Sequence, residues 1–290
     1  MSDLLCLGLG YSARMVATRL AREGWRIAGT AREAGGLDRI ADAGWRALPF
    51  DAAAPSPALA AALRAATHVL VSIPPDAAGD PVLRCHGDDL RQAAGLCWIG
   101  YLSTVGVYGD HAGGWVDEAT PPAPVSQRSR WRVAAEAEWL AAGAACAVPV
   151  QVFRLAGIYG PGRSAIDSLR AGTARRIVKP GQVFNRIHVE DIATTVLAGM
   201  AHPEATGLFN VTDDEPAPPQ DVVAFAASLL GVPPPPEMPF ETAELSPMAR
   251  SFYGETKRVA NGRIKRALGV TLRYPSYREG LAAIMETAGS

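Results

Sequence analysis

Short apolar runs alternate with amphipathic segments through the first 160 residues of the chain. Predicted strands lie at 4–10, 25–32, 45–51, 67–75, 96–104 and 148–160. Predicted helices lie between them at 11–24, 36–44, 56–66, 81–94 and 126–143. Strands that alternate with helices pair in parallel through right-handed crossovers, and runs without polar alternation suit strands covered on both faces. The pattern predicts an α/β protein with a doubly wound parallel sheet.

The regular alternation of strands and helices ends after Pro161, where glycine, proline and short elements dominate. We expect a turn and helix at 187–200, a strand at 207–212, a stiff proline-rich extended segment at 231–240 and a small helix at 261–269. We predict two domains. The first spans 1–160, with 186–212 returning to it, and a smaller C-terminal lobe spans 161–290.

Composition narrows the class of protein. Of the 290 residues, 48% are hydrophobic and 20% charged, and the net charge is -1, so nothing indicates a nucleic-acid or membrane surface. Four scattered cysteines, of which Cys6 and Cys97 lie in apolar runs, favour buried, reduced thiols in a cytoplasmic protein over a disulfide framework. No signal segment is expected at the start, and the apolar runs fall short of the ~18 residues that a membrane helix needs. The histidines show no metal-binding spacing, and no metal is expected.

A glycine motif follows the first predicted strand and opens the first helix. It reads Gly8-Leu9-Gly10-Tyr11-Ser12-Ala13, a GxGxxA pattern. In a dinucleotide site the first glycine allows a tight turn, the second lets the backbone approach a pyrophosphate, and the helix N-terminus supplies free N–H groups. The alternative is a turn that only connects strand to helix. We expect dinucleotide binding, with Gly8, Gly10, Tyr11, Ser12 and Ala13 at the cofactor.

The end of the second strand bears on which dinucleotide is bound. An NAD site usually offers an acidic residue there, whereas this strand ends in Ala31-Arg32. Arg32 could pair with the 2′-phosphate of NADP, or it could be a solvated surface arginine; we favour NADP over NAD. Asp51 could cap the adenine amine or be an ordinary turn residue. Ser72, Ile73 and Pro74, which close the fourth strand, are expected to line the path of the cofactor.

Further motifs follow in a fixed order. They are Leu102–Asp110 (LSTVGVYGD), Glu118–Pro121 (EATP), Arg154–Gly162 (RLAGIYGPG), Ile187–Asp191 (IHVED) and Phe209–Val211 (FNV). Over residues 4–215 the chain resembles the extended short-chain dehydrogenase/reductase superfamily of NAD(P)-dependent epimerases and dehydratases, and within it an atypical, poorly characterised branch. The resemblance implies a Rossmann-type domain followed by a C-terminal substrate-binding lobe.

Members of that superfamily usually work with a Ser/Thr–Tyr–Lys set. The tyrosine exchanges a proton with the substrate, the lysine four residues later lowers the tyrosine pKa and holds the nicotinamide ribose, and the Ser/Thr hydroxyl orients the substrate oxygen. By its spacing before Tyr108, Thr104 matches the Ser/Thr position. The alternative is a strand-end threonine satisfied locally.

The tyrosine and lysine positions both hold arginine. In the superfamily these two residues lie on the helix that leads to the segment Ala134-Ala135-Glu136. Counting back four residues from Glu136 places the lysine position at Arg132, and four more place the tyrosine position at Arg128. A guanidinium stays protonated and cannot act as a general acid or base. Two arginines at i and i+4 could instead clamp a carboxylate or phosphate, or both could lie on a solvated helix face.

Other candidates lie further along the chain. The string Tyr253–Lys257 matches YxxxK, but it lies beyond the last predicted sheet strand and is best read as a chance match, although Lys257 and Arg258 could reach substrate from the lobe. Tyr159, Arg163 and Arg186 are candidate substrate-binding residues, each with a structural alternative.

The sequence therefore favours an NADP-dependent oxidoreductase or epimerase acting on a sugar-nucleotide or small carbonyl substrate, with a non-standard proton relay. The arginine clamp would suit an anionic substrate. A non-catalytic NADP(H)-binding sensor or regulator is the alternative, and a structural protein with a degenerate site is the third. The family resemblance also implies a homodimer formed through the helices at 81–94 and 126–143.

Overall fold

The computed structural model describes residues 2–288, which divide into two compact units. The first unit runs up to Thr104 and adds Gln127–Arg154 and Ala193–Phe209. The second contains Val105–Ser126, Leu155–Ile192 and the chain from Asn210 onwards. The segment 105–126, which the sequence-based boundary at residue 160 assigned to the first domain, thus groups with the second unit.

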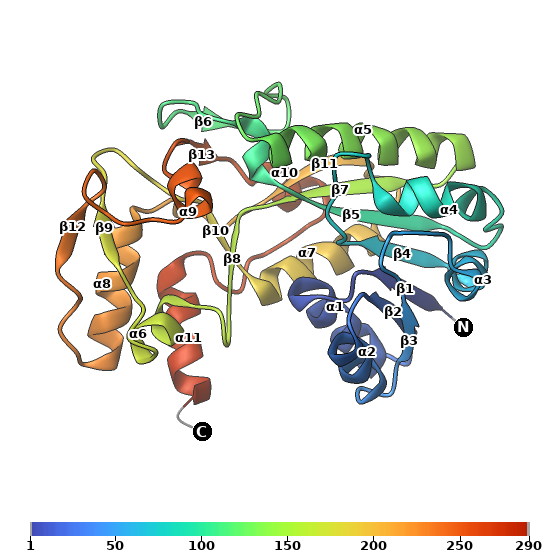
Figure 1. The fold of residues 1–290 in the computed structure, drawn as a ribbon, viewed down its shortest axis with the longest axis horizontal. Helices are drawn as coiled ribbons and strands as arrows, with labels where there is room; N and C mark the ends of the chain where they lie inside the picture. The colour runs from blue at the N-terminus through green and yellow to red at the C-terminus, as the bar shows by residue number, and fades with distance from the viewer. Residues whose placement is uncertain (1, 289–290) are drawn as a thin grey trace. The chain divides into compact units, whose positions relative to one another are not determined.

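A seven-stranded sheet forms the centre of the first unit (Figure 1). Its strands are β1 (Asp3–Leu7), β2 (Arg26–Ala31), β3 (Arg46–Pro49), β4 (His68–Val71), β5 (Trp98–Thr104), β7 (Val150–Leu155) and β11 (Gly207–Val211). The strand order is β11-β7-β5-β4-β1-β2-β3, and β1 pairs in parallel with both β2 and β4. The direction of winding reverses between β1 and β4, and this confirms the predicted doubly wound α/β fold of the Rossmann type.

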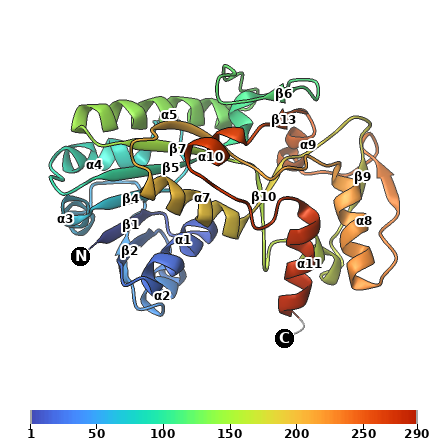
Figure 2. The same cartoon turned by 180° about the vertical axis from the view of Figure 1, so that it is seen from behind.

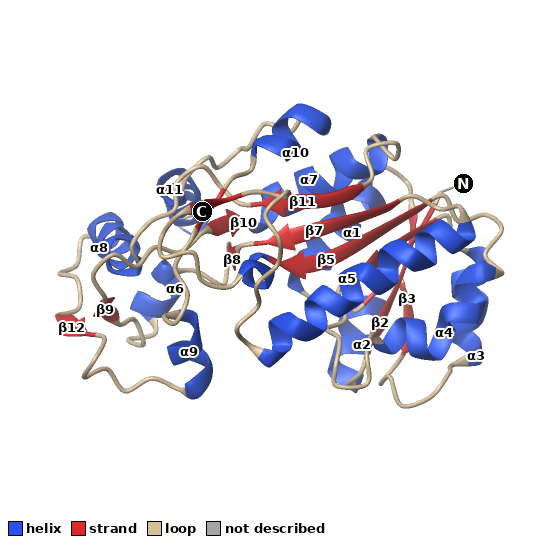
Figure 3. Cartoon of the chain, turned by 90° about the horizontal axis from the view of Figure 1, so that it is seen from above, coloured by secondary structure: helices blue, strands red, loops and turns tan. Residues whose placement is uncertain are grey.

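Helices cover both faces of this sheet. They are α1 (Tyr11–Arg22), α2 (Ala34–Ala41), α3 (Pro57–Ala65), α4 (Pro81–Arg91), α5 (Gln127–Cys146) and α7 (Val189–Ala201). Seen from above, α4 and α5 run along one face, while α1 and α7 lie behind the strands (Figure 3). The inner strands read as mainly apolar runs because they are covered on both sides; β7 is buried at every position.

Two expectations from the sequence are corrected at strand ends. The apolar run 148–160 is not one strand: β7 ends at Leu155, and β8 (Gly157–Tyr159) pairs instead with β10 (Arg186–His188). Cys97 is exposed rather than buried, because β5 begins only at Trp98, and its thiol lies 3.1 Å from the carbonyl oxygen of Thr67. All four cysteines are free.

A buried ion pair joins α5 to the sheet. Glu136 on α5 is 3% exposed and Arg154 on β7 is 1% exposed. The Arg154 guanidinium donates from Nη2 (2.7 Å) and from Nε (3.1 Å) to the Glu136 carboxylate, which also accepts a hydrogen bond from the hydroxyl of Ser103 on β5. One carboxylate therefore ties the helix to two neighbouring strands.

The second unit is built from short elements (Figure 2). Besides β8 and β10, its strands are β6 (Trp115–Val116), β9 (Arg176–Val178), β12 (Glu237–Pro239) and β13 (Arg258–Val259). Its helices are α6 (Ala165–Arg170), α8 (Pro219–Leu230), α9 (Pro247–Phe252), α10 (Gly262–Ala267), α11 (Tyr277–Ala288) and the 3₁₀ turn η1 (Val105–Tyr108). A small core lies between α6, α8 and α11, where Ile166, Ala226 and Leu281 are buried.

The segment 105–126 is anchored inside this unit. The hydroxyl of Tyr108, which is fully buried, donates to the side-chain oxygen of Asn210 at 2.8 Å, and the backbone N–H of His111 donates to the carbonyl of Thr256. These contacts are far apart in sequence, so a boundary drawn along the chain could not anticipate them. Within residues 2–288, no helix is both long and apolar enough to cross a membrane.

The Glu136–Arg154 pair makes a direct prediction about stability. Replacing Arg154 by Met should lower the free energy of unfolding by about 3–5 kcal/mol, because it leaves the Glu136 charge buried without its partner. Urea denaturation measures the change. Arg130→Met, at an exposed position of the same helix, should change stability by no more than about 0.5 kcal/mol. Equal effects of the two substitutions would contradict the structural role of the pair.

Candidate functional site

The glycine motif forms the turn between β1 and α1 and is held from both neighbouring strands. The Gly8 N–H donates to the hydroxyl of Thr30 on β2 at 2.7 Å, and the hydroxyl of Ser72, after β4, donates to the Gly8 carbonyl. The Gly10 N–H closes the turn on the same carbonyl at 2.9 Å. Thr30 was not singled out from the sequence, although a hydroxyl residue at the end of the second strand, 22 positions after Gly8, could have been noticed.

The two glycines of this turn are needed for different reasons. Gly8 has a φ of +88°, and a Cβ there would lie 2.9 Å from Cγ1 of Ile73, so the fold itself requires glycine. A Cβ on Gly10 would meet no protein atom within 4 Å. No side chain caps the N-terminus of α1, which begins directly after Gly10. The packing of the protein does not explain Gly10, whereas close approach of a pyrophosphate to the backbone does; these residues therefore fit a dinucleotide.

The rest of the predicted cofactor residues lie around this turn. Ser12 and Ala13 are buried in the first turn of α1, and Tyr11 is exposed. The backbone N–H groups of Ser72 and Ile73 both donate to the carbonyl of Leu7, so the segment leading to Pro74 follows the end of β1 at the point where the sheet reverses. Ligands of doubly wound sheets bind at this reversal, beyond the carboxyl ends of the strands.

Arg32 and Asp51, which are predicted to contact the adenosine half of the cofactor, each make one weak or local contact within the protein. The Arg32 side chain is 74% exposed, directly after β2, and pairs with Glu33 across 3.5 Å. An ion pair this exposed contributes little to stability, so the guanidinium can exchange it for a phosphate. The Asp51 carboxylate accepts a hydrogen bond from the N–H of Ala53 at 2.9 Å. Asp51 therefore forms an ordinary turn, and one of its oxygens is already used.

Thr104 is the last residue of β5 and is half-buried. On α5, Arg132 donates from Nη1 to the carbonyl of Leu102 at 2.8 Å and to the hydroxyl of Tyr101 at 3.0 Å, so it is tied to the same strand. Burial raises the pKa of Tyr101, which keeps this phenol protonated. Arg128, one turn earlier on α5, is exposed and makes no hydrogen bond to any residue of the described chain. Only one of the two arginines is therefore fixed by the protein.

The YxxxK string near the C-terminus does not form a helical pair. Tyr253 caps the end of α9, and Lys257 follows a turn just before β13. Lys257 is 6% exposed, and its ammonium donates to the carbonyl of Gly109 and to Glu255, each at 2.7 Å. Arg258 likewise donates to the carbonyl of Gly113. Both side chains hold the turn after η1, a role within the second unit.

Two of the three predicted substrate residues lie on neighbouring strands of the second unit. Tyr159 on β8 is buried and its hydroxyl donates to the carbonyl of Ser276 at 3.2 Å. Arg186 on β10 is partly buried, and its Nη1 donates to the carbonyls of Phe184 and Ala217, each at 3.0 Å. Arg163 is exposed in the turn that follows β8.

Asp213, which the sequence analysis missed, lies beside Arg186. Asp213 is only 1% exposed. Burial raises its pKa to about 8, although the Arg186 charge and the N–H of Glu215 oppose the shift. A run of acidic residues directly after β11 (TDDE) was the available signal. Among the described residues, no group of three or more His, Cys, Asp and Glu side chains could hold a metal ion.

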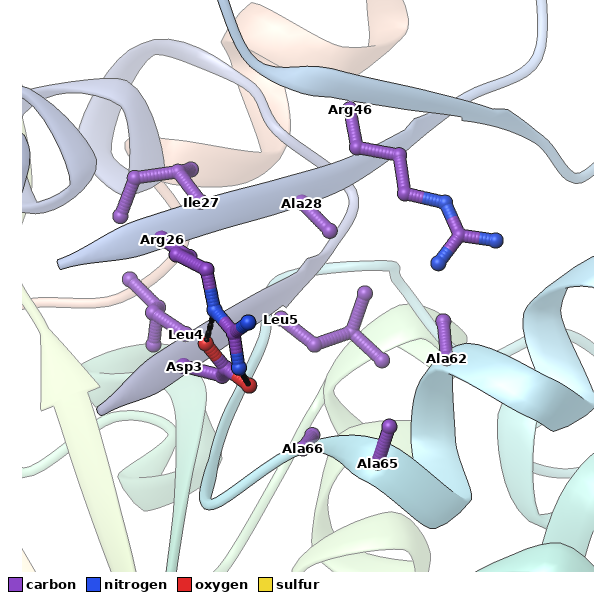
Figure 4. A pocket seen from close by; sticks show the side chains of 10 residues that line it. All are labelled: Asp3, Leu4, Leu5, Arg26, Ile27, Ala28, Arg46, Ala62, Ala65 and Ala66. Carbon is purple, nitrogen blue, oxygen red and sulfur yellow. Dashed lines mark hydrogen bonds and ion pairs between the residues drawn. The ribbon is translucent and has the colours of Figure 1, made fainter. Parts of the chain in front are cut away.

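A pocket of about 290 Å³ lies elsewhere in the first unit (Figure 4). Leu4 and Leu5 line it from the start of β1, Ile27 from the start of β2, and Ala62 and Ala66 from α3 and its end. These are the amino ends of the strands, opposite to the glycine turn, so the pocket is not part of the cofactor site.

Comparison with known proteins is consistent with this geometry. Residues 91–212 match the NAD dependent epimerase/dehydratase family. A 3-diazoavenalumate denitrifying reductase from a Streptomyces species is 34% identical over 45% of this chain, and the match spans 45% of that protein's length.

Two solved structures extend the likeness to the complete chain. A functionally unknown conserved protein from Silicibacter pomeroyi DSS is 51% identical, with a TM-score of 0.89 and full coverage of both chains. The structure of MoeE5 in complex with UDP-glucose and NAD is 22% identical, with a TM-score of 0.79 over 99% of each chain. The fold, the ordered motifs and the family match over residues 91–212 agree with the resemblance to the extended short-chain dehydrogenase/reductase superfamily of epimerases and dehydratases.

Proposed function

We propose that the protein is an NADP-dependent oxidoreductase or epimerase that acts on a sugar-nucleotide or small carbonyl substrate. The observation that carries the proposal is the glycine turn, where Thr30 and Ser72 fix Gly8 while the Cβ direction of Gly10 meets no protein atom. No side chain caps the N-terminus of α1, whose N–H groups would bind a pyrophosphate.

Similar proteins support the class of ligand. The partial Streptomyces relative is named a reductase. MoeE5 was solved with UDP-glucose and NAD, and the human epimerase family protein SDR39U1, 17% identical with a TM-score of 0.73, was solved with NADPH. A nicotinamide cofactor for this chain is therefore our proposal, and Arg32 at the end of β2 favours NADP.

The residues would divide the work as follows. A bound nicotinamide would supply the site for hydride transfer. Backbone N–H groups of α1 would hold the pyrophosphate, and Ser72, Ile73 and Pro74 would line the cofactor. The hydroxyl of Thr104 would orient a substrate oxygen, and Arg132, held by β5, would offer its Nε and Nη2 hydrogens to ribose hydroxyls or to an anion.

The proposed reaction needs a proton donor or acceptor, and the arginines of α5 cannot provide it. Arg128 and Arg132 keep their protons at any working pH, so neither can replace the missing tyrosine. Tyr101 does not replace it either, because burial raises its pKa and its hydroxyl already accepts from Arg132. The proton would come from a substrate group, a water molecule or a side chain of the second unit.

A non-catalytic NADP(H) sensor is the second candidate function. The observation that favours it is the arginine at the tyrosine position, together with the engagement of Arg132 by the backbone of β5. Both candidates require the cofactor, and only the first requires turnover.

The glycine turn predicts two different outcomes for the same substitution. Gly10→Ala should leave the free energy of unfolding within about 0.5 kcal/mol of the parent and weaken NADP(H) binding at least about tenfold, because the added methyl blocks approach of the pyrophosphate. Gly8→Ala should cost about 1–3 kcal/mol of stability, because its φ is +88°. Urea denaturation and cofactor-fluorescence titration measure the two effects. Unchanged binding by Gly10→Ala would refute the pyrophosphate site.

The choice of dinucleotide is predicted to depend on Arg32. Arg32→Ala should weaken NADP binding about 10- to 100-fold and leave NAD binding nearly unchanged, because a charge-assisted hydrogen bond to the 2′-phosphate contributes about 1.5–3 kcal/mol. Arg46→Ala, also exposed but at the amino end of β3, is the control and should change neither affinity. Equal losses for both dinucleotides would contradict phosphate pairing.

Turnover separates the two candidate functions. We expect the protein loaded with NADPH to oxidise it with at least one member of a panel of carbonyl compounds and sugar nucleotides, followed by the absorbance of the reduced nicotinamide. Saturable binding without turnover across the panel would favour the sensor. Failure to bind either dinucleotide would overturn both candidates.

A further inference from the structure

We propose that Arg186 and Asp213 form an oxyanion-binding subsite in the second unit, which takes a carboxylate or phosphate group of the substrate. The inference rests on the proposed function in one respect, since the oxyanion would belong to the substrate. Binding at the subsite can be measured without cofactor or turnover.

The guanidinium of Arg186 is held by the protein on one side and can bind a ligand through its other edge. The two Nη1 hydrogens are directed at the carbonyls of Phe184 and Ala217, each 3.0 Å away, and these bonds fix the plane of the group. Within residues 2–288 Arg186 makes no ion pair, so Nε and Nη2 keep three donors for another partner. A fixed guanidinium edge binds carboxylates and phosphates through two parallel hydrogen bonds.

Asp213 stands next to this guanidinium without forming an ion pair. Its backbone N–H donates to the carbonyl of Arg186 at 2.7 Å, which places the two residues side by side. The carboxyl oxygen Oδ1 accepts only from the N–H of Glu215 at 3.3 Å, and Oδ2 is buried with no hydrogen-bond partner in the described chain. A buried carboxyl oxygen without a partner is costly, so a ligand at this position would be favoured.

The neighbouring acidic residues differ from Asp213 because each of them has a basic partner. Asp214 pairs with Lys265 at 2.6 Å, and Glu215 pairs with Arg278 at 3.1 Å. Asp213 is therefore the acid of its loop that lacks a basic partner within the described residues, and Arg186 is the adjacent base that lacks an acidic one. An unpaired guanidinium and an unpaired carboxyl that lie close together suit a third group that binds both.

The charges around Asp213 decide the form in which it binds. Arg186 faces it from β10, Tyr159 from β8, and Asp214 and Glu215 from its own loop. Burial is the largest influence and raises the pKa of Asp213 to about 8, so at pH 7 the carboxyl is mostly protonated.

A protonated Asp213 can donate a hydrogen bond to an oxyanion, as Arg186 does, so the two groups bind the oxyanion together. Above pH 8 the ionised carboxylate repels the oxyanion and draws the guanidinium to itself, so affinity must fall as the pH rises. The buried rings of Tyr253 and Tyr277, on which the Arg186 charge also acts, surround the guanidinium with weakly polar material that strengthens both effects.

Sulfate is a suitable probe because it does not titrate in this range. Calorimetric titration of the full chain at constant ionic strength should show saturable sulfate binding that weakens about 30-fold between pH 6.5 and pH 9.5, as expected for a required proton with a pKa of about 8. Asp213→Asn, whose amide mimics the protonated carboxyl, should bind sulfate equally at both pH values. Arg186→Gln should remove this binding, and the exposed control Arg266→Gln should not.

A second readout follows the proton itself. The infrared carbonyl band of a protonated carboxyl, absent from Asp213→Asn, should be present at pH 6.5 and should shift on addition of sulfate. Titrations with acetate and with methyl phosphate, compared between the parent and Arg186→Gln, distinguish a carboxylate from a phosphate as the preferred group.

Three results would overturn the subsite. They are sulfate binding that is the same in Arg186→Gln and the parent, binding in the parent that does not change with pH, and an infrared band unaffected by Asp213→Asn. None of these depends on the cofactor. Loss of dinucleotide binding in the parent protein would instead contradict the proposed function and leave the sulfate result standing.

Discussion

The carboxylate of Glu136 fixes the position of α5 against the sheet. It accepts hydrogen bonds from Arg154 on β7 and from Ser103 on β5, all in a buried setting where an unpaired charge would be very costly. Because a helix turns 100° per residue, fixing Glu136 also fixes the backbone positions four and eight residues earlier. These are Arg132 and Arg128. One ion pair therefore fixes the part of α5 that carries the arginines at the predicted lysine and tyrosine positions.

That placement changes which chemistry the first unit can perform. Arg132 turns toward β5 and uses one nitrogen on Tyr101 and Leu102, so it is a positioned donor and not a mobile ammonium. The glycine turn that we propose binds a dinucleotide is present, whereas the arginines at the predicted tyrosine and lysine positions of α5 cannot exchange a proton. Under the proposed function, any proton relay must therefore be built from groups other than these arginines.

The second unit contains a different kind of arrangement. Most of its charged side chains near β11 are paired, as Asp214 with Lys265 and Glu215 with Arg278, and contribute to the fold. Arg186 and Asp213 are the exception among these neighbours, since each is buried or partly buried and each lacks an ionic partner in the described chain. A protein keeps such groups at a cost to its stability, and the oxyanion that we propose would offset part of that cost.

The sequence by itself determined the alternation of strands and helices, the glycine turn and a helix close to 126–143, because each is encoded in local periodicity or in spacing along the chain. It could not determine that 105–126 joins the second unit, that 148–160 splits between two sheets, or that Cys97 is exposed. These outcomes depend on partners far away in sequence, such as Asn210 for Tyr108. The site divides in the same way. Gly8 and Gly10 follow from the motif, whereas Arg186 and Asp213 come to lie side by side only when β10 meets the segment after β11. Burial and missing partners are properties of the tertiary structure.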